Sequence, residues 1–494
     1  MKQKIHLLFF SILLLHSGVG VHAQKEATYW YFGDRVGMDF SDVLNGNQTV
    51  PYAITGPINT WEGCFSISDK DGNFLFASDG STVYNGPLPS NIMPGGTGLQ
   101  GNSMSAQSGI LIPCPGAADK YFVVTVPSLE LPNAGIRYSV IDLSVPGGQV
   151  ISKNTPLSLL GSGIAANETY ENVSAVSKEN DIDYWLIHRV KDKFLIWDVT
   201  SSGIQGDPTV TNIGRDLTAE AGNGAKVGYI KFSPDGKKIV HVGGESKWVT
   251  IADFDNATGQ ITNIKERKIT TTGMWLYGVE FSPSGNYIYF CAVFDGNVMS
   301  LPTDNFDSAP VTTLPIKGAA LQLGPDHKIY TVYVANVGLR GKDLMVINNP
   351  DDGGSDISTY PNFFTVGNGN TCGLPTFVSS FFGITGIKVV PENPCKETPV
   401  NVSIKMSPGT GANAVDKIVW DFGDGTLPIT ENNIISATYS QTHIYEKRGV
   451  YTLTITPYRP DNTVIIEKIK TEKIKIGSCL LPVNHNISVM GYYD

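Results

Sequence analysis

A strand–turn–strand unit that returns along the chain constrains this sequence more than any other feature. Its clearest copy is GYIKFSPDGKKIV at residues 228–240. Pro234 presets φ in the turn, and Gly236 accepts a positive φ that residues with a Cβ resist. The unit returns about 49 residues later as GVEFSPSGNYIY (278–289) and, more weakly, as LQLGPDHKIY (321–330). A repeat of roughly 40 to 50 residues built on short strands is typical of a β-propeller with one four-stranded blade per repeat.

The spacing of these turns predicts the number of blades. Turn centres near residues 71, 119, 181, 235, 284 and 326 indicate six units. Strands around Trp30 and Ile54, together with residues 373–377, supply a seventh. We therefore expect about seven blades over residues 28–385, with six or eight as alternatives, and an extended surface loop at 85–109. Pairing of the first and last strands would close the ring and remove exposed sheet edges.

The N-terminus reads as an export signal. Lys2 and Lys4 precede a short apolar run at residues 7–15, and small residues follow at 21–23. This order predicts a signal peptide over residues 1–23, cleaved between Ala23 and Gln24. The apolar run is too short to span a bilayer, and no later run is long enough for a transmembrane segment. We expect an exported protein, located extracellularly, at the cell surface or in the periplasm.

Composition narrows the class of protein. The high glycine count (53) and the many Tyr and Phe residues (21 each) suit an all-β fold with many turns. After loss of Lys2 and Lys4, 34 basic residues stand against 46 acidic ones, a formal charge of −12. Because no basic cluster stands out, the sequence argues against nucleic-acid binding.

The pattern changes after Cys395. Residues 400–404, 417–422, 440–445, 449–455 and 464–476 read as strands of a β-sandwich over residues 388–477, followed by a C-terminal tail at 478–494. Side chains at 420 and 422 should point inward and those at 419 and 421 outward, with Tyr451 and Leu453 on the opposing sheet. The motif WDFGDGT (420–426), followed by HIY (443–445) and GVYTL (449–453), closely resembles a PKD domain, an immunoglobulin-like fold. The resemblance marks a structural motif formed by Trp420, Asp421, Phe422, Gly423, Asp424, Gly425 and Tyr451.

The propeller repeats resemble WD-like and Tol-B-type repeats. A signal peptide, such a propeller and a PKD domain together resemble the large cell-surface proteins of Bacteroidota. That resemblance implies a secreted binding protein, whose PKD domain acts as a spacer or as a protein- or carbohydrate-contacting module. Such proteins often carry a further C-terminal sorting domain for secretion, whereas this chain ends at Asp494.

No catalytic, metal-binding or cofactor-binding motif stands out. His188 and His241 lie in expected strands and His327 in a turn, and some hydrolytic propellers place such residues at the central channel. Packing or surface polarity is the simpler interpretation. Residues 69–73 resemble a calcium loop, but their glycine comes too early for an EF-hand, so we expect a plain hairpin turn. Five tryptophans could stack on sugars, although blade packing explains most of them: Trp61, Trp185, Trp197, Trp248 and Trp275.

Two functions follow from these patterns. We favour an exported, non-enzymatic binding or adhesion protein, in which the propeller contacts a protein or glycan ligand at the cell surface. The alternative is an exported propeller hydrolase or lyase acting on a glycan or peptide. Clustered carboxylates and histidines at the channel mouth would favour the alternative.

A disulfide between Cys395 and Cys479 is a further expectation. The two residues flank the sandwich, and an exported chain meets an oxidising compartment. First and last strands of a small sandwich can approach to the roughly 5.5 Å Cα separation that a disulfide needs. Two buried free thiols are the alternative, because position along the chain is the basis of this pairing.

Overall fold

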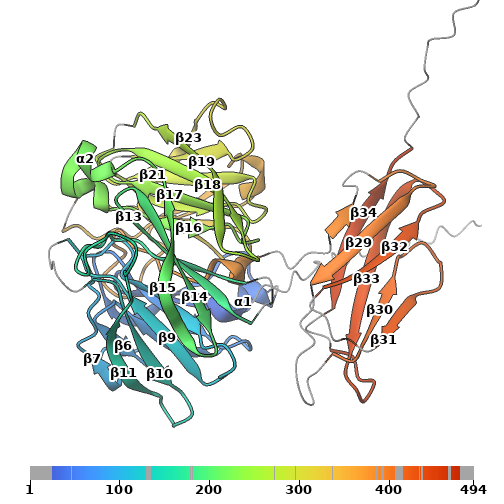
Figure 1. Cartoon of the computed structure of the whole chain (residues 1–494), viewed down its shortest axis with the longest axis horizontal. Helices are drawn as coiled ribbons and strands as arrows, with labels where there is room; N and C mark the ends of the chain where they lie inside the picture. Colours follow the sequence, from blue (N-terminus) through green and yellow to red (C-terminus); the bar gives the residue numbers. More distant parts are fainter. Residues whose placement is uncertain are drawn as a thin grey trace, which may run out of the picture.

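The structure is a computed structural model, and its secondary structure is almost entirely β (Figure 1). It describes residues 25–478 except 46, 130–134, 179, 181, 272, 295, 337, 384–387, 391–393, 406–414, 433, 435–437 and 466–468. The described helical segments are short: α1 (Ser41–Leu44), α2 (Leu217–Ala221), η1 (Lys25–Ala27), η2 (Gly222–Lys226), η3 (Pro350–Asp352) and η4 (Ser379–Phe382).

Seven antiparallel sheets follow one another along the first part of the chain, numbered here in chain order. Sheet 1 has three strands: β1 (Tyr29–Phe32), β2 (Asp34–Asp39) and β3 (Tyr52–Asn59). Sheet 2 holds β4 (Phe65–Ser68), β5 (Phe74–Ser78), β6 (Thr82–Tyr84) and β7 (Ile92–Thr97). Sheet 3 holds β8 (Gly109–Pro113), β9 (Lys120–Thr125), β10 (Arg137–Asp142) and β11 (Gln149–Pro156). Sheet 4 holds β12 (Ser174–Ser177), β13 (Tyr184–Val190), β14 (Lys193–Thr200) and β15 (Gly203–Asn212).

The last three of these sheets also have four strands each, and every strand pairs with its neighbour in sequence. Sheet 5 holds β16 (Ile230–Phe232), β17 (Lys238–Gly243), β18 (Trp248–Asp255) and β19 (Gln260–Lys268). Sheet 6 holds β20 (Leu276–Phe281), β21 (Tyr287–Ala292), β22 (Asn297–Pro302) and β23 (Thr312–Lys317). Sheet 7 holds β24 (Leu321–Leu323), β25 (Ile329–Val332), β26 (Leu344–Ile347) and β27 (Ile357–Tyr360). β7 lies inside residues 85–109, so the expectation of an extended loop there was wrong. The sequence of this outer strand shows little hydrophobic alternation, and it was therefore not recognised as a strand.

The sheets form a propeller-like ring. The first strand of each of sheets 2 to 6 contacts the first strand of the next sheet, and β1 contacts β4. A C-terminal segment closes the ring between sheets 7 and 2: the N–H of Ala320 donates to the Cys372 carbonyl (3.0 Å), and the N–H of Thr376 donates to the Cys64 carbonyl (2.9 Å). Residues 372–376 thus take the innermost position beside sheet 1, as predicted for the seventh blade.

The turn chemistry read from the sequence accounts for the first hairpin of sheets 5 to 7. Gly236 and Gly285 have φ of 68° and 74°, and His327 takes the same left-handed position with φ of 62°. In sheet 5 the hydroxyl of Ser233 accepts the N–H of Lys238 (2.8 Å) and donates to Asp235 (2.7 Å). In each Ser-Pro-x-Gly turn the serine hydroxyl therefore accepts a backbone N–H at the start of the next strand, and this hydrogen bond stabilises the turn.

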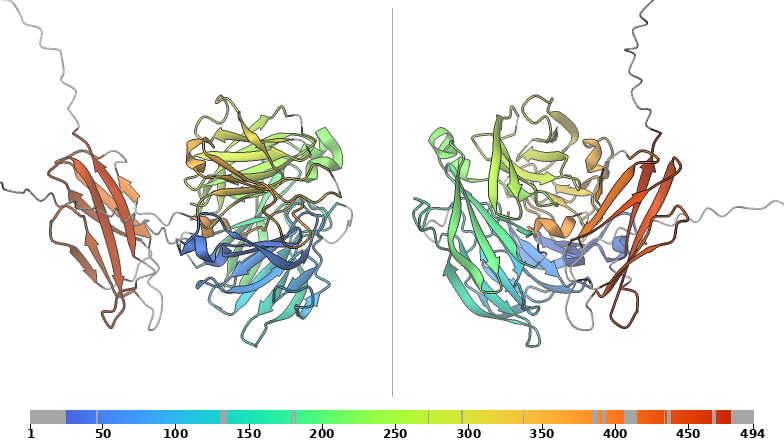
Figure 2. Two further views of the ribbon diagram at one scale, coloured as in Figure 1. Left: turned by 180° about the vertical axis from the view of Figure 1, so that it is seen from behind. Right: turned by 45° about the vertical axis from the view of Figure 1, so that its right-hand side comes forward.

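The C-terminal part of the chain forms two further antiparallel sheets, which share a second hydrophobic core (Figure 2). One holds β28 (Lys388–Val390), β29 (Pro399–Lys405) and β32 (Thr438–Ile444), and the other holds β31 (Ile429–Asn432), β30 (Lys417–Asp421), β33 (Gly449–Tyr458) and β34 (Lys470–Ile476). Val402 from the first sheet and Ile455 and Ile474 from the second lie in this core.

The side-chain alternation expected around Trp420 agrees with this core. Trp420 and Phe422 are buried, whereas Asp421 is exposed. The expectation that Tyr451 and Leu453 lie on the opposing sheet was wrong, because β33 pairs directly with β30. The alternation of buried and exposed side chains shows which face of a strand is buried. It does not show whether two strands that are distant in sequence pair within one sheet or lie in opposing sheets.

Hydrogen bonds within the turn, and one contact with β32, fix the WDFGDGT segment. The carboxylate of Asp421 accepts the N–H of Gly423 (2.9 Å), and that of Asp424 accepts the N–H of Thr426 (3.1 Å). Asp424 also pairs with His443 Nε2 at 2.7 Å, and the His443 ring stacks on Phe422 at 4.0 Å. These contacts tie the turn to the neighbouring sheet.

The cysteines divide between the two parts of the chain. Cys64, Cys114, Cys291 and Cys372 are free thiols, whereas Cys395 is disulfide-bonded. Cys479 lies outside the described residues, so its pairing with Cys395 stays a prediction. The described chain end runs beside Cys395, since the N–H of Lys396 donates to the Gly477 carbonyl (2.9 Å). The expected signal peptide and its cleavage site at Ala23 and Gln24 also lie outside the described residues.

Candidate functional site

The two faces of the propeller differ in how its centre is closed. At the ends of the first strands, η4 lies against β12: the Ser380 hydroxyl accepts the N–H of Ser177 (3.0 Å), and the Ser174 and Ser379 hydroxyls lie 3.4 Å apart. Phe381 of η4 is buried. The opposite face, called here the entry face, consists of the loops that lead into the first strand of each sheet.

A buried polar chain crosses the centre between sheets 5, 6 and 7. Lys231, Glu280 and Gln322 occupy equivalent middle positions of β16, β20 and β24, and each is at most 3% exposed. Lys231 Nζ lies 2.9 Å from Glu280 and 2.6 Å from Gln322. Glu280 also accepts the N–H groups of Leu323 (3.1 Å) and Phe281 (3.0 Å). Because these polar groups form hydrogen bonds with one another, the buried network joins three blades and leaves few donors or acceptors for a ligand.

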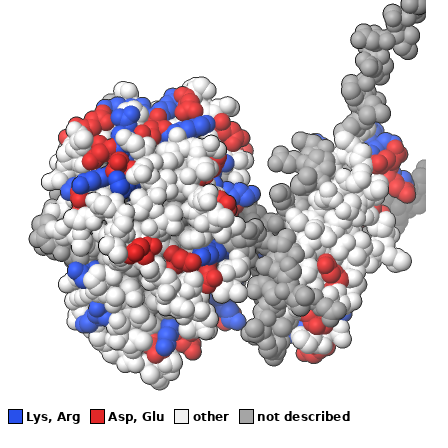
Figure 3. Space-filling view, viewed as in Figure 1, with Lys and Arg blue, Asp and Glu red and all other residues white. Residues whose placement is uncertain are grey.

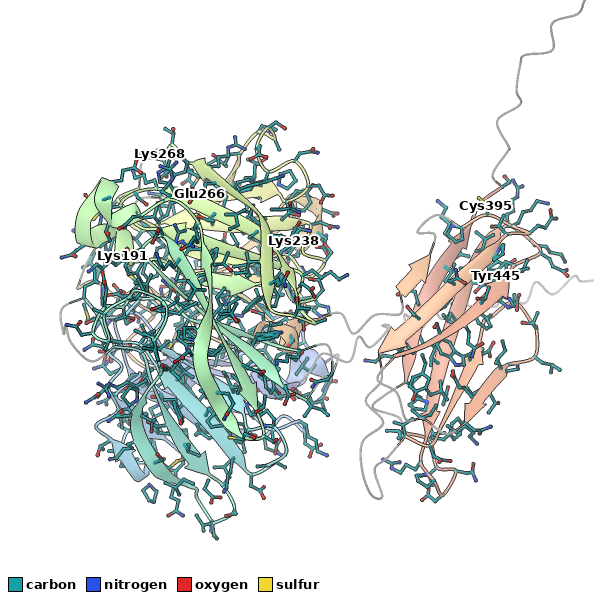
Figure 4. The ribbon with its side chains drawn as sticks, viewed as in Figure 1. Lys191, Lys238, Glu266, Lys268, Cys395 and Tyr445 are labelled. Atoms are coloured by element: carbon teal, nitrogen blue, oxygen red, sulfur yellow. The ribbon has the colours of Figure 1, made fainter. Side chains whose placement is uncertain are left out.

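A hollow of about 520 Å³ opens on the entry face between the loop before β16 and the end of β19. Its lining consists of Gly214, Arg215, Asp216, Ala219, Glu220 and Glu266. We call it the entry-face hollow. Figure 3 shows charges of both signs over this part of the propeller, and Figure 4 labels Glu266 and Lys268 of β19, of which Lys268 pairs with Glu220 of α2.

Ion pairs and one indole organise the charges of the entry-face hollow. Arg215 lies 3.1 Å from Glu266 and 3.7 Å from Glu220, and its guanidinium stacks over the Trp248 ring at 3.8 Å. Lys268 lies 2.6 Å from Glu220, which also accepts the Trp248 indole N–H (2.8 Å). Hydrogen bonds from Lys268 and Trp248 lower the pKa of the Glu220 carboxyl. The hollow thus presents fixed charges of both signs beside an aromatic ring.

A buried arginine supports the floor of the entry-face hollow. Arg189 on β13 donates to Thr250 (2.7 Å), shares a hydrogen bond with His241 Nδ1 (3.0 Å) and lies 3.7 Å from Glu266. Burial lowers the pKa of His241 well below its ordinary value, and Arg189 lowers it further. His241 is therefore neutral near pH 7 and can accept from the guanidinium.

The structure places the histidines singled out by the sequence away from the centre of the ring. His188 and His241 lie on β13 and β17, the second strands of their sheets. Burial lowers the pKa of His188 to about 4, although its hydrogen bond to the Asn172 carbonyl (2.6 Å) opposes the shift. His327 occupies the first turn of sheet 7 on the opposite face. His188 lies near enough to His241 to contribute to the lowered pKa of His241, whereas His327 lies on the other face.

The other residues singled out in the sequence are the 69–73 segment and the five tryptophans, and most of them have a structural role. Asp69 accepts the N–H groups of Asp71 and Asn73 (both 2.9 Å), as expected of a plain hairpin turn. Trp197 is fully buried and Trp185 nearly so. Trp61, Trp248 and Trp275 are half-buried, and of these Trp248 borders the entry-face hollow.

Sequence reasoning missed the charged residues of the entry-face hollow. Arg215 and the helix α2 with Glu220 lie in the connection before β16, and Glu266 lies on the outermost strand of sheet 5. They meet only because the sheet brings its last strand beside that loop. No fixed spacing marks such a set, so a single sequence carries no signal for it.

A second hollow of about 400 Å³ lies along β17, β18 and β19 of sheet 5, beside the end of β22 in sheet 6. Its lining comprises Lys238, Ile251, Ala252, Asp253, Asn263, Ile264, Lys265 and Thr303. The Asn263 amide donates to Asp253 (2.7 Å), and Lys265 pairs with Asp307 at 3.3 Å. This outer hollow lacks an aromatic ring among its lining residues and serves as the comparison site below.

Within the described ranges, no group of three or more His, Cys, Asp or Glu side chains is arranged to hold a metal ion. Among the helices that the structure describes, none is long and apolar enough to cross a membrane.

Comparison with known proteins identifies structural neighbours but no family. No protein-family model matches the chain, and no curated protein sequence matches it. Similar solved structures are β-propeller-like. A Bacteroides fragilis protein provisionally described as a 6-phosphogluconolactonase is 9% identical with a TM-score of 0.46, covering 71% of this chain and 98% of its own.

Two further neighbours illustrate the range. The β-propeller domain of Myceliophteria thermophila Cps50 (Swd1) is 10% identical with a TM-score of 0.39, covering 68% of this chain and 96% of its own. The extracellular domain of a B. thetaiotaomicron protein, provisionally described as a one-component system, is 12% identical with a TM-score of 0.35. That match covers 91% of this chain and 56% of the other. At these identities the comparisons concern the fold alone.

Proposed function

We propose that this chain is an exported, non-enzymatic binding or adhesion protein whose propeller contacts a protein or glycan ligand through the entry face. One observation carries the proposal. The entry-face hollow holds Arg215, Glu220 and Glu266 in fixed ion pairs beside the Trp248 ring. A preorganised set of donors and acceptors next to an aromatic surface suits recognition of a polar ligand, because little side-chain ordering remains to be done on binding.

The proposed organisation assigns a role to each part of the chain. Residues 1–23 would direct export, residues 28–385 would form the binding propeller and residues 388–477 would form a PKD domain that spaces it from its attachment. The two-sheet core around Trp420 and the Asp424–His443 contact support the PKD assignment. The Cys395–Cys479 disulfide belongs to the same proposal.

The hydrolase or lyase alternative would need a nucleophile and a base within reach of bound substrate. His188 and His241 are completely buried, and their lowered pKa values reflect that burial. His241 is engaged by Arg189 behind the floor of the hollow. These contacts favour a supporting role for the histidines over proton transfer to a ligand.

A glycan and peptide array probed with the chain from Gln24 onward tests the proposal. We expect selective binding, reduced about tenfold or more in Trp248→Ala and Arg215→Ala, because both changes remove contact groups of the hollow. Lys265→Ala, at the outer hollow, is the matched control and should bind as the unmodified chain does. Equal binding by all three variants would contradict the assignment of the site, and ligand turnover would favour the enzymatic alternative.

A further inference from the structure

A second set of charged and aromatic side chains meets on the entry face, at the place where the ring closes. Trp61 lies in the loop from β3 into β4, and Arg340 lies in the connection between β25 and β26. Arg340 Nε donates to the Asp34 carboxylate (3.2 Å), and its guanidinium lies over the Trp61 ring, 5.3 Å from the centroid. The N–H of Cys372, in the ring-closing segment, donates to the Trp61 carbonyl (3.1 Å). We call Asp34, Trp61 and Arg340 the ring-closure site.

The backbone around residue 369 fixes these side chains relative to one another. The N–H of Asp34 donates to the Gly369 carbonyl (3.0 Å), and Gly341 and Asn370 exchange two N–H···O bonds (3.0 and 2.9 Å). Gly369 has φ of 124°, and an added Cβ would lie 2.5 Å from the Gly341 carbonyl oxygen. Distant parts of the chain therefore meet in a close backbone approach that needs glycine. The carboxylate and the guanidinium of Arg340 are thus held in place before any ligand binds.

The ring-closure site has the same chemistry as the entry-face hollow. Its ion pair spans 3.2 Å, and the arginine and carboxylate side chains are 32% and 14% exposed. The corresponding values for Arg215 and Glu266 are 3.1 Å, 38% and 15%. In each site the guanidinium lies over a half-buried indole, Trp61 at 5.3 Å and Trp248 at 3.8 Å. Two such sets on one face suit a ligand that presents the same chemical unit more than once, as a repeating polymer does.

The charges of the ring-closure site select the chemistry of that unit. Arg340 and Asp34 neutralise each other, so the pair as a whole favours neither an anion nor a cation. Among the described residues Arg340 has partners at Nε and Nη1 only, so Nη2 can still donate. Each Asp34 oxygen accepts one hydrogen bond, from Arg340 or from Asn368 (3.1 Å), and each has capacity for another. A neutral sugar has hydroxyls that donate and accept, and a C–H surface that packs beside an indole.

We propose that the ring-closure site binds a neutral sugar unit, and that the ligand of the entry face is a neutral polysaccharide that contacts both this site and the entry-face hollow. The inference rests on the proposed binding function and names its ligand class. A chain that occupies both sites gains affinity because the second contact is intramolecular. Loss of either site should therefore weaken binding of the same polymer.

Native gel electrophoresis of the chain from Gln24 onward, in gels that contain a soluble polysaccharide, tests the proposal. The neutral probes are dextran, galactomannan, xyloglucan and laminarin, and polygalacturonate is the charged control. We expect at least one neutral probe to retard the chain more strongly than polygalacturonate does. Arg340→Gln and Trp61→Leu should each raise the apparent Kd for that probe about tenfold, because they remove a charged donor and the aromatic ring. Lys342→Gln makes the same charge change at an exposed side chain of the same connection, and should bind as the unmodified chain does.

Comparison with Trp248→Ala separates this inference from the function assigned to the hollow. Weaker binding of one neutral polysaccharide by Arg340→Gln and by Trp248→Ala, with the Tm of Arg340→Gln unchanged, would support both. If Trp248→Ala alone weakened binding, the ring-closure site would have no part in it and this inference would be wrong, whereas the proposed function would stand. Retardation by none of the neutral probes, or stronger retardation by polygalacturonate, would also overturn the inference. A peptide ligand bound at the hollow would in that case preserve the proposed function.

Discussion

The centre of the propeller and its entry face both contain ion pairs of similar length, but the pairs differ in burial. Lys231 and Glu280 lie 2.9 Å apart with side chains 2% and 4% exposed. Arg215 and Glu266 lie 3.1 Å apart with side chains 38% and 15% exposed. Water compensates a broken pair at the surface, whereas a broken pair at the centre leaves a charge with few partners. Similar distances therefore imply unequal consequences, because breaking the buried pair should cost more free energy of unfolding than breaking the exposed pair.

Loss of the central cation should have the largest effect. Lys231→Met leaves Glu280 buried without its cation, and we expect the free energy of unfolding of the propeller to fall by about 3–5 kcal/mol. Hydrogen exchange of the amides in β16, β20 and β24 would measure it. The double variant Lys231→Met/Glu280→Gln should regain much of the loss. If Lys231→Met lowered the free energy of unfolding by less than about 1 kcal/mol, the central ion pair would be no more important for stability than the surface pairs.

Acid should destabilise the propeller through its buried neutral histidines. Burial lowers the pKa of His188 from 6.5 to about 4, so the unfolded chain binds more protons between these values. The free energy of unfolding should accordingly fall as pH decreases from 6.5 toward 4, by up to about 3 kcal/mol from this residue. Urea unfolding between pH 5 and 6.5 would show a shallower pH dependence in His188→Gln. An unchanged slope would contradict this role of burial.

The exposed pairs of the entry-face hollow should contribute little to stability. Arg215→Ala is expected to change the free energy of unfolding by no more than about 1 kcal/mol, because water screens its two carboxylate partners. Unfolding at low and high salt would measure the effect, which should shrink as salt increases. A loss as large as that of Lys231→Met would show that the hollow is a structural element, and would weaken its assignment as a binding site.

The contact between Asp424 and His443 in the sandwich should give the smallest effect. Burial alone would raise the pKa of Asp424, but hydrogen bonds from Thr426 and His443 outweigh it and lower the pKa. The stabilisation is thus complete above pH 3.8, the ordinary value, and is lost as pH falls through the lower folded value. Asp424→Asn should cost less than about 1 kcal/mol near pH 5, measured by hydrogen exchange of β33. A difference from the unmodified chain that persists in strong acid would point to packing instead.

Local chemistry explains which parts of this fold could be predicted. The turns at Gly236 and Gly285 need a positive φ, and the sequence marks that requirement directly. The alternation of Trp420 and Phe422 likewise follows from the two-residue period of a strand. Tyr451 was assigned to the wrong sheet because strand pairing depends on long-range topology. The proximity of Arg215 and Glu266 could not be predicted for the same reason. It arises only because sheet 5 brings its last strand beside the loop before β16.

The ring closure has a consequence for the order in which the chain can fold. The Thr371 hydroxyl donates to the Thr60 carbonyl at 3.0 Å across a separation of 311 residues, so the contact joins the earliest and latest parts of the propeller. Such distant contacts slow folding, because the closure entropy is lost before the contact forms. During N-to-C synthesis, the ring can close only after residue 376 has emerged. Until then the inner strands of sheets 2 and 7 have an open edge that another chain could pair with.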